Sequence, residues 1–472
     1  MKVLLVRSNE FTRSSETNIT GIYPPLGLAY IASSLVSAGH KAHIIDNQVA
    51  GLSGNMLKDK IKKYDPDIVL MSAMTPSWQS VVSMARFLKK VAPKIKIVVG
   101  GPHLTAYPAE SLSEDSIDFG VYGEGEVTVQ EAIKAIENGS DLAGMPGIIY
   151  RTEDGVIVNP PRKEIEDLDS VPFPAVEMLP YSRYLALSVK SPFFTIVTSR
   201  GCPYRCTFCY QGYLGRYRAR SAENVVEEME LLVNKFKMKE IIIFDETFCV
   251  DRDRVFAISD MIRRKNLRFK WDFRSRVDLI DGEILKAVKG AGCSRIHLGI
   301  ESGNQSTLDK MRKGITIPEI IHKVRLAKKA GLEVRGYFML AYPGETMKHM
   351  LKTAEFAKSL PLDWASFTVT IGLPCTEIYK QALEEKTFEL DYWREYTKGN
   401  TLNARPYFTG GGLDENDIFA LKRRAYLKFY LRPRSIANLL KCVAYNGIYG
   451  NLNTLLKVLP RAYSSAFKRA AP

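Results

Sequence analysis

Three of the chain's seven cysteines, Cys202, Cys206 and Cys209, lie within eight residues. They follow an apolar, β-rich run at residues 193–198 and stand in a segment marked by glycine and proline. These signals predict a strand that ends in a loop carrying the cysteines. Enzymes built from strands and helices keep their chemistry at strand ends, so the C-x3-C-x2-C spacing indicates a functional site. Three thiolates without a fourth cysteine nearby suit an iron–sulfur cube with one open iron.

Two other uses of these cysteines, a zinc site and a disulfide framework, fit less well. A zinc site needs four ligands, but the nearest downstream histidine is His297 and the chain has no second C-x2-C pair. The odd number of cysteines and the lack of a secretion signal disfavour a disulfide framework. We therefore favour a cluster, with zinc as the alternative. The other cysteines, which we interpret as core or loop thiols, are Cys249, Cys293, Cys375 and Cys442.

The cysteine loop resembles the signature of the radical S-adenosylmethionine (SAM) superfamily, in which an aromatic residue, here Phe208, usually precedes the last cysteine. The resemblance implies a [4Fe-4S] cluster on Cys202, Cys206 and Cys209 whose free iron binds the amino and carboxylate groups of SAM. One electron from the reduced cluster then cleaves SAM to methionine and a 5'-deoxyadenosyl radical, which removes hydrogen from the substrate. The resemblance also implies an electron donor such as flavodoxin or ferredoxin.

The length of 472 residues predicts two domains and an appendage rather than one core. We expect a first domain at residues 1–145, a proline-rich linker at 146–192, a radical SAM core at 193–385 and a basic, mostly helical region at 386–472. The first residues resemble a short strand, and not a signal peptide or a membrane span. A reducing, cytoplasmic location is therefore expected.

In the first domain, strands alternate with helices, which predicts a doubly wound parallel sheet covered on both faces. Ligands of such sheets bind at the carboxyl ends of the strands. There the sequence has loops of small and polar residues, 72–76, 100–103 and 123–126. The candidate binding residues in these loops are Ser72, Thr75, Gly100, Gly101, Gly123, Glu124 and Gly125.

The loops do not contain the G-x-G-x-x-G spacing of a dinucleotide site after the first strand. Together with segments 24–30 and 65–67, they resemble instead the cobalamin-binding domain found in front of many radical SAM enzymes. That resemblance implies cobalamin as a cofactor, the alternative being a fold kept without it. The D-x-H-x-x-G motif, which supplies a cobalt ligand in other cobalamin domains, is absent, and we interpret His40 and His43 as structural.

From residue 193 onward the alternation of strands and helices resumes with six predicted strands, and the resemblance implies a partial (β/α)6 barrel of the TIM type. By the same resemblance, Asp245 and Glu246 accept hydrogen bonds from the SAM amino group. Arg274 or Arg276 pairs with its carboxylate. The other implied contacts are Glu301 and Ser302 at the ribose, Gly336 and the turn 342–345 of the fifth strand, and Pro374 beside the adenine.

The formal charge of +14 is concentrated in the tail, where residues 421–472 contain eleven Lys and Arg and no Asp or Glu. The nearly neutral body argues against nucleic-acid binding by the whole protein. A helix should begin near Asp414 and stop at Pro433. The apolar stretch at 436–459 is too interrupted to span a bilayer. The tail is therefore either a helical cap over the barrel mouth or a contact with an anionic membrane surface.

The main hypothesis is a cobalamin-dependent radical SAM enzyme that methylates an unactivated carbon of a small-molecule or lipid-like substrate. A runner-up is a cyclase, ring-contraction or oxidation enzyme acting on a lipid- or tetrapyrrole-like substrate, as in anaerobic porphyrin cyclases. A non-catalytic sensor of cobalamin or of the cluster is the alternative of another class. A methylthiotransferase is disfavoured, because no cysteine precedes Cys202 to hold a second cluster.

Overall fold

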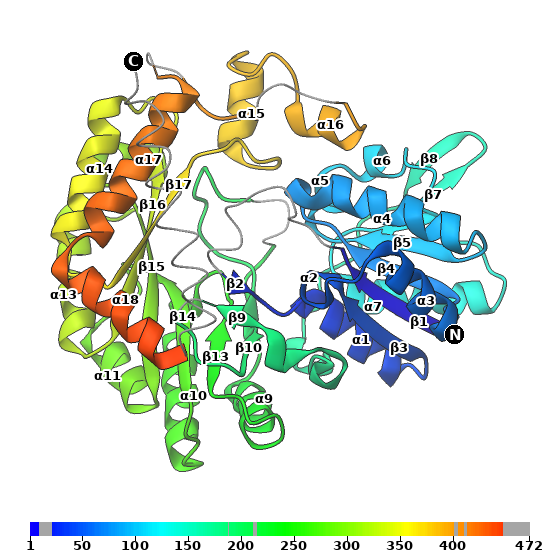
Figure 1. Cartoon of the computed structure of the whole chain (residues 1–472), viewed down its shortest axis with the longest axis horizontal. Coiled ribbons are helices and arrows are strands. Elements are labelled where there is room, and N and C mark those ends of the chain that lie inside the picture. The colour runs from blue at the N-terminus through cyan, green and yellow to red at the C-terminus, as the bar shows by residue number, and fades with distance from the viewer. Residues whose placement is uncertain (9–20, 187, 211–214, 401–404, 410–412, 447–472) are drawn as a thin grey trace.

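The computed structural model describes residues 1–8, 21–186, 188–210, 215–400, 405–409 and 413–446. Its N-terminal part forms a seven-stranded sheet, and its central part forms a curved six-stranded sheet with helices on its outer side (Figure 1). A helical C-terminal region packs against the last strand of the curved sheet. This architecture confirms the expected fold class.

The N-terminal sheet has the strand order β3-β1-β4-β5-β6-β7-β8. The first five strands in this order are parallel, and the last two form an antiparallel hairpin. Residues 148–158, which fall within the expected linker at 146–192, thus extend the N-terminal sheet. The strands are β1 (Lys2–Arg7), β3 (Lys41–Asp46), β4 (Ile68–Ser72), β5 (Lys96–Gly100), β6 (Phe119–Val121), β7 (Ile148–Thr152) and β8 (Gly155–Val158).

Helices cover both faces of this sheet, as the apolar strands require. In β1, Val3 and Leu5 pack in the cluster that includes helices α1 and α7, whereas Leu4 and Val6 pack in the cluster that includes α3 and α4. All four side chains are fully buried. The helices of this part are α1 (Leu26–Ser37), α2 (Asn47–Ala50), α3 (Gly54–Tyr64), α4 (Trp78–Val91), α5 (Pro102–Ala106), α6 (Pro108–Ser111) and α7 (Gly125–Glu137).

The curved sheet is an all-parallel half-barrel with the strand order β10-β13-β14-β15-β16-β17. Its strands are β10 (Phe193–Ile196), β13 (Glu240–Ile243), β14 (Lys270–Arg276), β15 (Cys293–Glu301), β16 (Glu333–Leu340) and β17 (Trp364–Val369). The helices after successive strands are α9 (Ala222–Asn234), α10 (Arg252–Arg264), α11 (Gly282–Gly290), α12 (Gln305–Lys310), α13 (Ile317–Lys329) and α14 (Met347–Ser359). Two short ladders join β2 (Gly21–Ile22) to β9 (Leu185–Ala186), and β11 (Ser199–Arg200) to β12 (Arg218–Ala219).

Alternation along β16 shows how the half-barrel separates its two faces. Val334, Phe338 and Leu340 are buried in the core beneath the helices. Arg335 and Tyr337, which alternate with them, are only partly buried. Successive side chains of a strand point to opposite faces, so these two residues face the concave side.

The C-terminal helix α17 (Glu415–Tyr430) begins where the sequence predicts. Asp414 caps it by accepting a hydrogen bond from the backbone amide of Asp417 at 2.7 Å. The helix packs on the outer face of β17 and on α14, with Phe429 fully buried and Tyr426 stacked edge-on against Phe367. The expected cap over the barrel mouth is therefore wrong for this helix, because its apolar side is used against the outside of the sheet.

Two short helices, α15 (Glu377–Glu384) and α16 (Tyr392–Thr397), follow β17 and reach the N-terminal domain (Figure 1). The indole Nε1 of Trp78 donates to the carbonyl of Thr397 at 3.0 Å, and the hydroxyl of Tyr107 donates to Asp391 at 2.8 Å. The final described helix is α18 (Pro433–Asn446). None of the helices in the described ranges is long and apolar enough to cross a bilayer.

Candidate active site

The cysteine loop begins at the carboxyl end of β10, as the sequence predicts, and passes through β11 before Cys202. Its middle is fixed to the opposite side of the half-barrel. The backbone amide of Thr207 donates to the carbonyl of Met311 at 3.2 Å, and the carbonyl of Thr207 accepts from the amide of Ile378 at 3.2 Å. The loop is thereby held across the carboxyl ends of the strands.

The three thiols of the loop share one environment. Cys206 is 8% exposed, and Cys202 and Cys209 are partly buried. Burial, with contributions from the neighbouring Cys206 and Cys202, raises the pKa of Cys209 to about 12. Burial also raises the pKa of Cys202, with Cys206 contributing. Cys202 and Cys209 therefore keep their protons at neutral pH until metal replaces them, so metal uptake would release protons.

Two cationic side chains lie beside the thiols. Nη1 of Arg276 donates to Sγ of Cys206 at 3.6 Å, and its guanidinium stacks 3.7 Å from the ring centroid of Tyr204. The charge of Lys313 opposes the effect of burial on the pKa of Cys209. Nearby cations favour thiolates, so both side chains would balance part of the negative charge of a bound cluster.

The donor set fits a [4Fe-4S] cluster held by Cys202, Cys206 and Cys209. Among the described residues, no three His, Cys, Asp or Glu side chains converge as the ligands of a single ion do. A cluster does not need such convergence, because its cysteines bind different irons. Bound together with SAM, a cluster of this kind supplies the electron that cleaves SAM. Phe208 packs against Met311 and its neighbours and so supports the loop from behind.

Asp245 lies at the end of β13 as expected, but its carboxylate is used inside the protein. One oxygen accepts from the backbone amide of Thr198 at 2.6 Å; the other accepts from the hydroxyls of Thr198 and Ser199 at 2.5 and 2.7 Å. The residue is fully buried. Asp245 therefore fixes the start of the cysteine loop to β13.

Glu246, the next residue, has an exposed side chain. Desolvation by the protein packed around its carboxyl group, together with the charge of Asp245, nevertheless raises the pKa of Glu246 to about 7. Arg200 and Arg274 oppose the shift. Of the two carboxylates expected at the SAM amino group, Glu246 is the one that faces open space.

The two expected arginines of β14 differ in their partners. Nε and Nη2 of Arg276 donate to the carboxylate of Asp278 at 3.0 and 3.1 Å. The guanidinium of Arg274 lies 4.0 Å from the ring centroid of Phe244 and donates to the carbonyl of Ile243 at 3.3 Å. It makes no ion pair with any residue that the structure describes. Arg274 is therefore the guanidinium that is available to a ligand carboxylate.

Glu301 ends β15 in a left-handed conformation, with φ of 68°, and forms an ion pair with Nζ of Lys313 at 3.0 Å. A Cβ atom at Gly299 would lie 2.5 Å from Oε1 of Glu301 and 2.9 Å from Nζ of Lys313. A larger residue at this position would therefore displace the carboxylate of Glu301 or the ammonium group of Lys313. The ion pair links β15 to the segment that also bonds the cysteine loop.

Three other expected SAM contacts lie in packed surroundings. Ser302 is fully buried, and its hydroxyl accepts from the backbone amide of Asn304 at 3.1 Å. Gly336 faces the helices, where an added Cβ would lie 2.9 Å from Cδ1 of Leu362. Pro374 is buried in the turn after β17. The structure gives Ser302 and Gly336 packing roles, and a contact of any of the three with SAM stays a prediction.

A pocket of about 130 Å³ lies at the carboxyl edge of the N-terminal sheet. Its lining includes six of the seven residues expected in the cobalamin loops, namely Ser72, Gly100, Gly101, Gly123, Glu124 and Gly125. Sequence reasoning missed its apolar part, which includes Leu28, Ile31, Val98, Val121 and Val129. These residues follow ordinary core periodicity, so no sequence signal separates them from the rest of the core.

The pocket fits one portion of a large ligand. Gly101 has φ of 102°, and an added Cβ would lie 2.7 Å from Oγ of Ser72 and 2.8 Å from the carbonyl oxygen of Ala73. Because glycine has no Cβ, the backbone at Gly101 can pack closely against Ser72 and Ala73, and a ligand can approach the backbone at the rim of the pocket. Pockets that enclose a whole drug-sized ligand measure about 300–1,000 Å³, so this pocket would hold only part of cobalamin.

Thr75, the seventh expected residue, lies outside the pocket lining. Its hydroxyl lies 3.4 Å from Nδ1 of His103, and Nε2 of His103 lies 3.3 Å from the hydroxyl of Thr397. Burial lowers the pKa of His103 to about 3, so the ring is neutral. Thr75 therefore belongs to the contact with α16. Nδ1 of His40 lies 3.4 Å from the carboxylate of Glu137, and the ring of His43 contacts that of Tyr64 in a tilted arrangement, as structural histidines do.

Ion pairs and a hydrogen bond join the pocket to the cysteine loop. Arg200, two residues before Cys202, pairs with Glu124 at 2.9 Å and also with Glu126. Arg218 donates to both carboxylate oxygens of Glu124 at 3.0 Å. Burial alone would raise the pKa of Glu124, but the hydrogen bond from Arg218 and the charge of Arg200 outweigh it and lower the pKa. Sequence reasoning missed both arginines.

Comparison with known proteins agrees with this geometry. A family model described as "Radical SAM superfamily" matches residues 196–357, and a "B12 binding domain" model matches residues 17–133. An uncharacterized methyltransferase of Pyrococcus horikoshii is 36% identical over 438 residues, which is 92% of this chain and 93% of that protein. The anaerobic magnesium-protoporphyrin IX monomethyl ester cyclase of Rubrivivax gelatinosus is 29% identical over 440 residues, or 91% of this chain and 78% of that protein.

Among solved structures, the radical SAM methyltransferase TsrM from Kitasatospora setae, with cobalamin and a [4Fe-4S] cluster bound, superposes with a TM-score of 0.74 at 18% identity. The match covers 98% of this chain and 99% of TsrM. It shows a shared fold. The fold and the cysteine loop define a radical SAM enzyme.

More particularly, the chain belongs to the radical SAM family that carries a cobalamin-binding domain, and it is methyltransferase-like. Its cofactors are a [4Fe-4S] cluster, SAM and cobalamin. The family assignment made from the motifs is confirmed.

Proposed function

We propose that the protein methylates an unactivated carbon of a small-molecule substrate. The attachment of the cysteine loop to the cobalamin pocket is the observation that carries this proposal. Besides the ion pairs of Arg200, the hydroxyl of Tyr210 donates to the carbonyl of Pro102, a pocket residue, at 2.9 Å. A reaction that uses both cofactors needs their sites fixed over one space, because orientation supplies much of the rate.

The chain's own residues have distinct roles in this proposal. Cys202, Cys206 and Cys209 hold the cluster. Glu246 accepts hydrogen bonds from the SAM amino group, for which its carboxylate must be ionised, and the ammonium charge favours that form. Arg274 forms the ion pair with the SAM carboxylate. Asp245, Arg276 and the Glu301–Lys313 pair position the loops that carry these groups.

Anaerobic reconstitution with iron, sulfide and hydroxocobalamin tests the reaction class. With SAM and a reductant, we expect release of 5'-deoxyadenosine, and with substrate we expect S-adenosylhomocysteine and a product heavier by one CH2 unit. Cys202→Ala should abolish the release of 5'-deoxyadenosine. The exposed Cys375→Ser is the matched control and should retain it. A Cys202→Ala protein that still releases 5'-deoxyadenosine contradicts the proposal, and a wild type that releases none favours the sensor alternative.

A cyclase reaction is the second candidate, and the similarity to the cyclase of Rubrivivax gelatinosus favours it. A cyclase product differs from its substrate by loss of hydrogen or gain of oxygen and not by gain of CH2. Product mass, together with the presence or absence of S-adenosylhomocysteine, separates the two reactions. The electron donor in either case is proposed to be a flavodoxin or ferredoxin.

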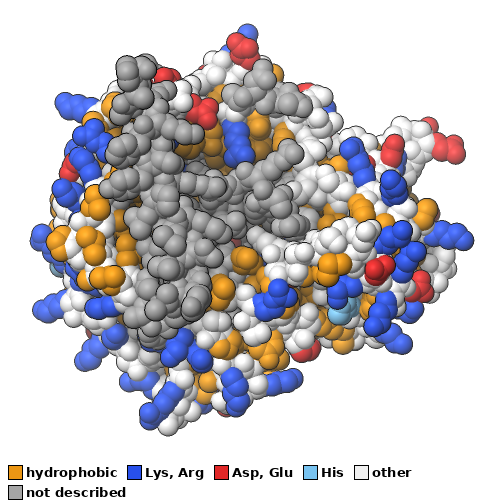
Figure 2. All heavy atoms as spheres, viewed as in Figure 1, with side chains coloured by type: hydrophobic (Ala, Val, Ile, Leu, Met, Phe, Trp, Pro, Cys, Tyr) orange, Lys and Arg blue, Asp and Glu red, His pale blue; other side chains and the backbone are white. Residues whose placement is uncertain are grey.

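The C-terminal helices support a proposed peripheral contact with membrane, and with it a lipid-like substrate. Leu431, directly after α17, and Leu440 on α18 are 66% and 65% exposed, and Arg423 on α17 and Lys441 on α18 are exposed as well. Exposed apolar side chains beside cations are typical of interfacial helices. Figure 2 shows the described Lys and Arg side chains also spread around the outline of the molecule. Leu431→Ser with Leu440→Ser should reduce binding to anionic liposomes, and unchanged binding argues for a solvated region.

A further inference from the structure

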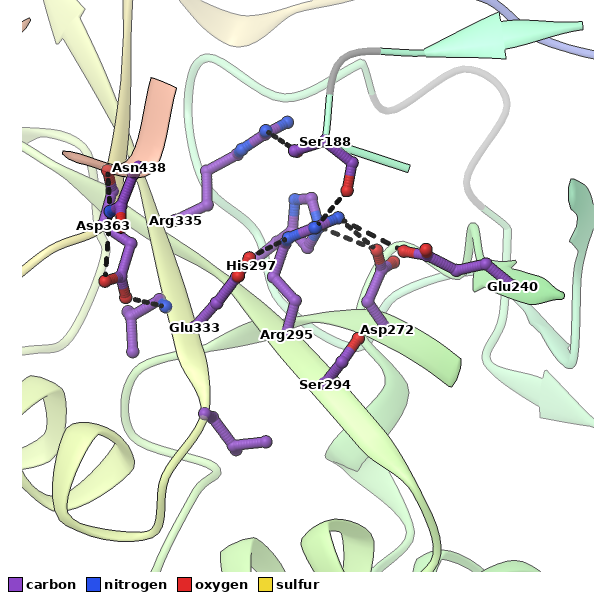
Figure 3. A network of polar contacts seen from close by, with 12 residues as sticks. Ser188, Glu240, Asp272, Ser294, Arg295, His297, Glu333, Arg335, Asp363 and Asn438 are labelled. Atoms are coloured by element: carbon purple, nitrogen blue, oxygen red, sulfur yellow. Dashed lines mark hydrogen bonds and ion pairs between the residues drawn. The ribbon is translucent and has the colours of Figure 1, made fainter. Parts of the chain in front are cut away.

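The concave side of the half-barrel contains a charged network near the amino ends of the strands, at the other end from the strand ends that the cysteine loop crosses. Arg295 is its centre and is 4% exposed. Its guanidinium forms ion pairs with Asp272 at 3.1 Å, Glu333 at 3.1 Å and Glu240 at 3.6 Å. Figure 3 shows these three carboxylates gathered around Arg295. They are therefore already engaged by one cation.

Arg335 lies in the same region without such a partner. In the strand register it is level with His297 on β15 and Trp364 on β17. Its Nη2 donates to the hydroxyl of Ser188 at 3.2 Å, the contact drawn in Figure 3, and its guanidinium lies 5.8 Å from the ring centroid of Trp364. It forms no ion pair within the described parts of the chain, although it is half-buried.

A second donor beside Arg335, the indole N–H of Trp364, has no acceptor among the described residues. Trp364 is 2% exposed, and its indole Nε1 has no hydrogen-bond partner among the described residues. A buried N–H without a partner costs free energy, so such a group in a native protein needs an explanation. Two neighbouring donors, one of them cationic, would both be satisfied by an acceptor that carries negative charge.

The surroundings favour an anion as well. Arg274 is level with His297 on the neighbouring strand and has no ion pair among the described residues. Burial and the charges of Arg335 and Arg274 lower the pKa of His297 to about 4, although Asp272 opposes the shift, so this ring is neutral and adds no competing charge. Among the described residues the arginines here are Arg295, which is buried and paired, and Arg274 and Arg335, which are partly buried and form no ion pair. The carboxylates are those of Asp272, Glu240 and Glu333, and burial raises the pKa of Glu240 to about 7.

We propose that Arg335 and Trp364 form a binding site for an oxyanion group, a carboxylate or a phosphoryl group, on the substrate. The proposal rests on the proposed function, because the concave side of the half-barrel is where a substrate would lie below the cluster. A substrate with an anionic group at one end would thereby present its other end to the cysteine loop.

Fluorinated probes test the site directly on the reconstituted protein. The probes are 4-fluorobenzoate and 4-fluorophenyl phosphate, with 4-fluorobenzamide as the neutral control, and binding is followed by fluorine NMR. We expect at least one anionic probe to bind at least about tenfold more tightly than the neutral probe, and the better anion tells whether the natural group is a carboxylate or a phosphate. Equal binding of all three probes by the wild-type protein overturns the proposal, and this result needs no variant.

Variants then place the binding at Arg335. Arg335→Gln should weaken the binding of the favoured anionic probe about tenfold, which corresponds to about 1.4 kcal/mol. Arg335→Lys keeps the positive charge and should lose less of the affinity for this probe. Arg325→Gln is the control. It removes an exposed arginine from α13, on the outer side of the half-barrel, and should leave the binding of the anionic probe unchanged. Binding by a folded Arg335→Gln protein that equals that of the wild type overturns the assignment.

The same preparations distinguish this inference from the proposed reaction. Release of 5'-deoxyadenosine by the wild-type protein without preference for anionic probes defeats the oxyanion site alone. Preference for an anionic probe without any release defeats the proposed reaction alone.

Discussion

Replacing Glu124 with Gln should disconnect the cobalamin pocket from the cysteine loop. The carboxylate of Glu124 bonds both Arg200 and Arg218, and the side chains of Glu124 and Arg218 are 12% and 6% exposed. Glutamine keeps the size of the side chain but removes its charge. Two largely buried guanidinium groups would then lose their common counter-ion.

The size of the effect follows from the burial of these groups. Removing one partner of a buried ion pair costs about 3–5 kcal/mol, because the other charge is left uncompensated. The side chain of Arg200 is 20% exposed and Glu126 can still pair with it, so we expect the lower end, about 3 kcal/mol. A surface pair is worth about 0–1 kcal/mol. Glu131→Gln provides that control, because Glu131 lies on α7, the helix that begins directly after Glu124, and its side chain is 47% exposed.

Urea unfolding followed by tryptophan fluorescence measures the difference. Because the pKa of Glu124 is lower in the folded protein, its contribution is fully present above its unfolded pKa, about 4.3, and is lost as pH falls through the folded value. The gap between the wild type and Glu124→Gln should therefore be constant from pH 5 to 8 and shrink below about pH 4. A Glu124→Gln protein that loses no more stability than Glu131→Gln refutes the reasoning.

Three further predictions concern separate features. Gly101→Ala should reduce uptake of hydroxocobalamin, because the added Cβ would meet Ser72 and Ala73. Gly39→Ala is the control and should not reduce uptake, because Gly39 also has a positive φ but has open space around it. Equal uptake by the two variants argues against a role of Gly101 at the pocket rim. Asp414→Ala should cost about 1 kcal/mol of stability in urea through loss of the α17 cap, and Asp414→Asn much less. The raised pKa of Glu246 means that the folded state binds its proton more tightly than the unfolded state does, so the wild type should lose stability as pH rises from about 4.5 to 7. Glu246→Gln should make this loss smaller. An unchanged profile of melting temperature against pH contradicts this prediction.

The parts of the fold that the sequence predicts are those set by local pattern. The apolar run before Cys202, the alternation of strands and helices, and the cap at Asp414 all depend on residues close in sequence, and all appear in the structure. The glycine loops could be placed at one edge of the N-terminal sheet because parallel strands bring their carboxyl ends together. Six of the seven expected residues line the pocket there for that reason.

The parts that could not be predicted depend on contacts between distant segments. Arg200 and Glu124 are 76 residues apart, and neither position has a pattern that distinguishes it from a surface charge. Asp245 has the residue type and the place of a ligand-binding carboxylate, but its position against Thr198 and Ser199 gives it an internal role. The position of α17 on the outer face of β17, and not over the mouth of the half-barrel, likewise depends on contacts with the distant elements β17 and α14.

The most direct test of the account is metal and sulfide analysis of protein purified and reconstituted without oxygen, combined with electron paramagnetic resonance of the reduced state with and without SAM. We expect about four irons and four sulfides per chain, and a cluster signal that SAM perturbs because one iron is free of protein ligands. Zinc in place of iron, or a cluster whose signal SAM leaves unchanged, would contradict the assignment of the cysteine loop.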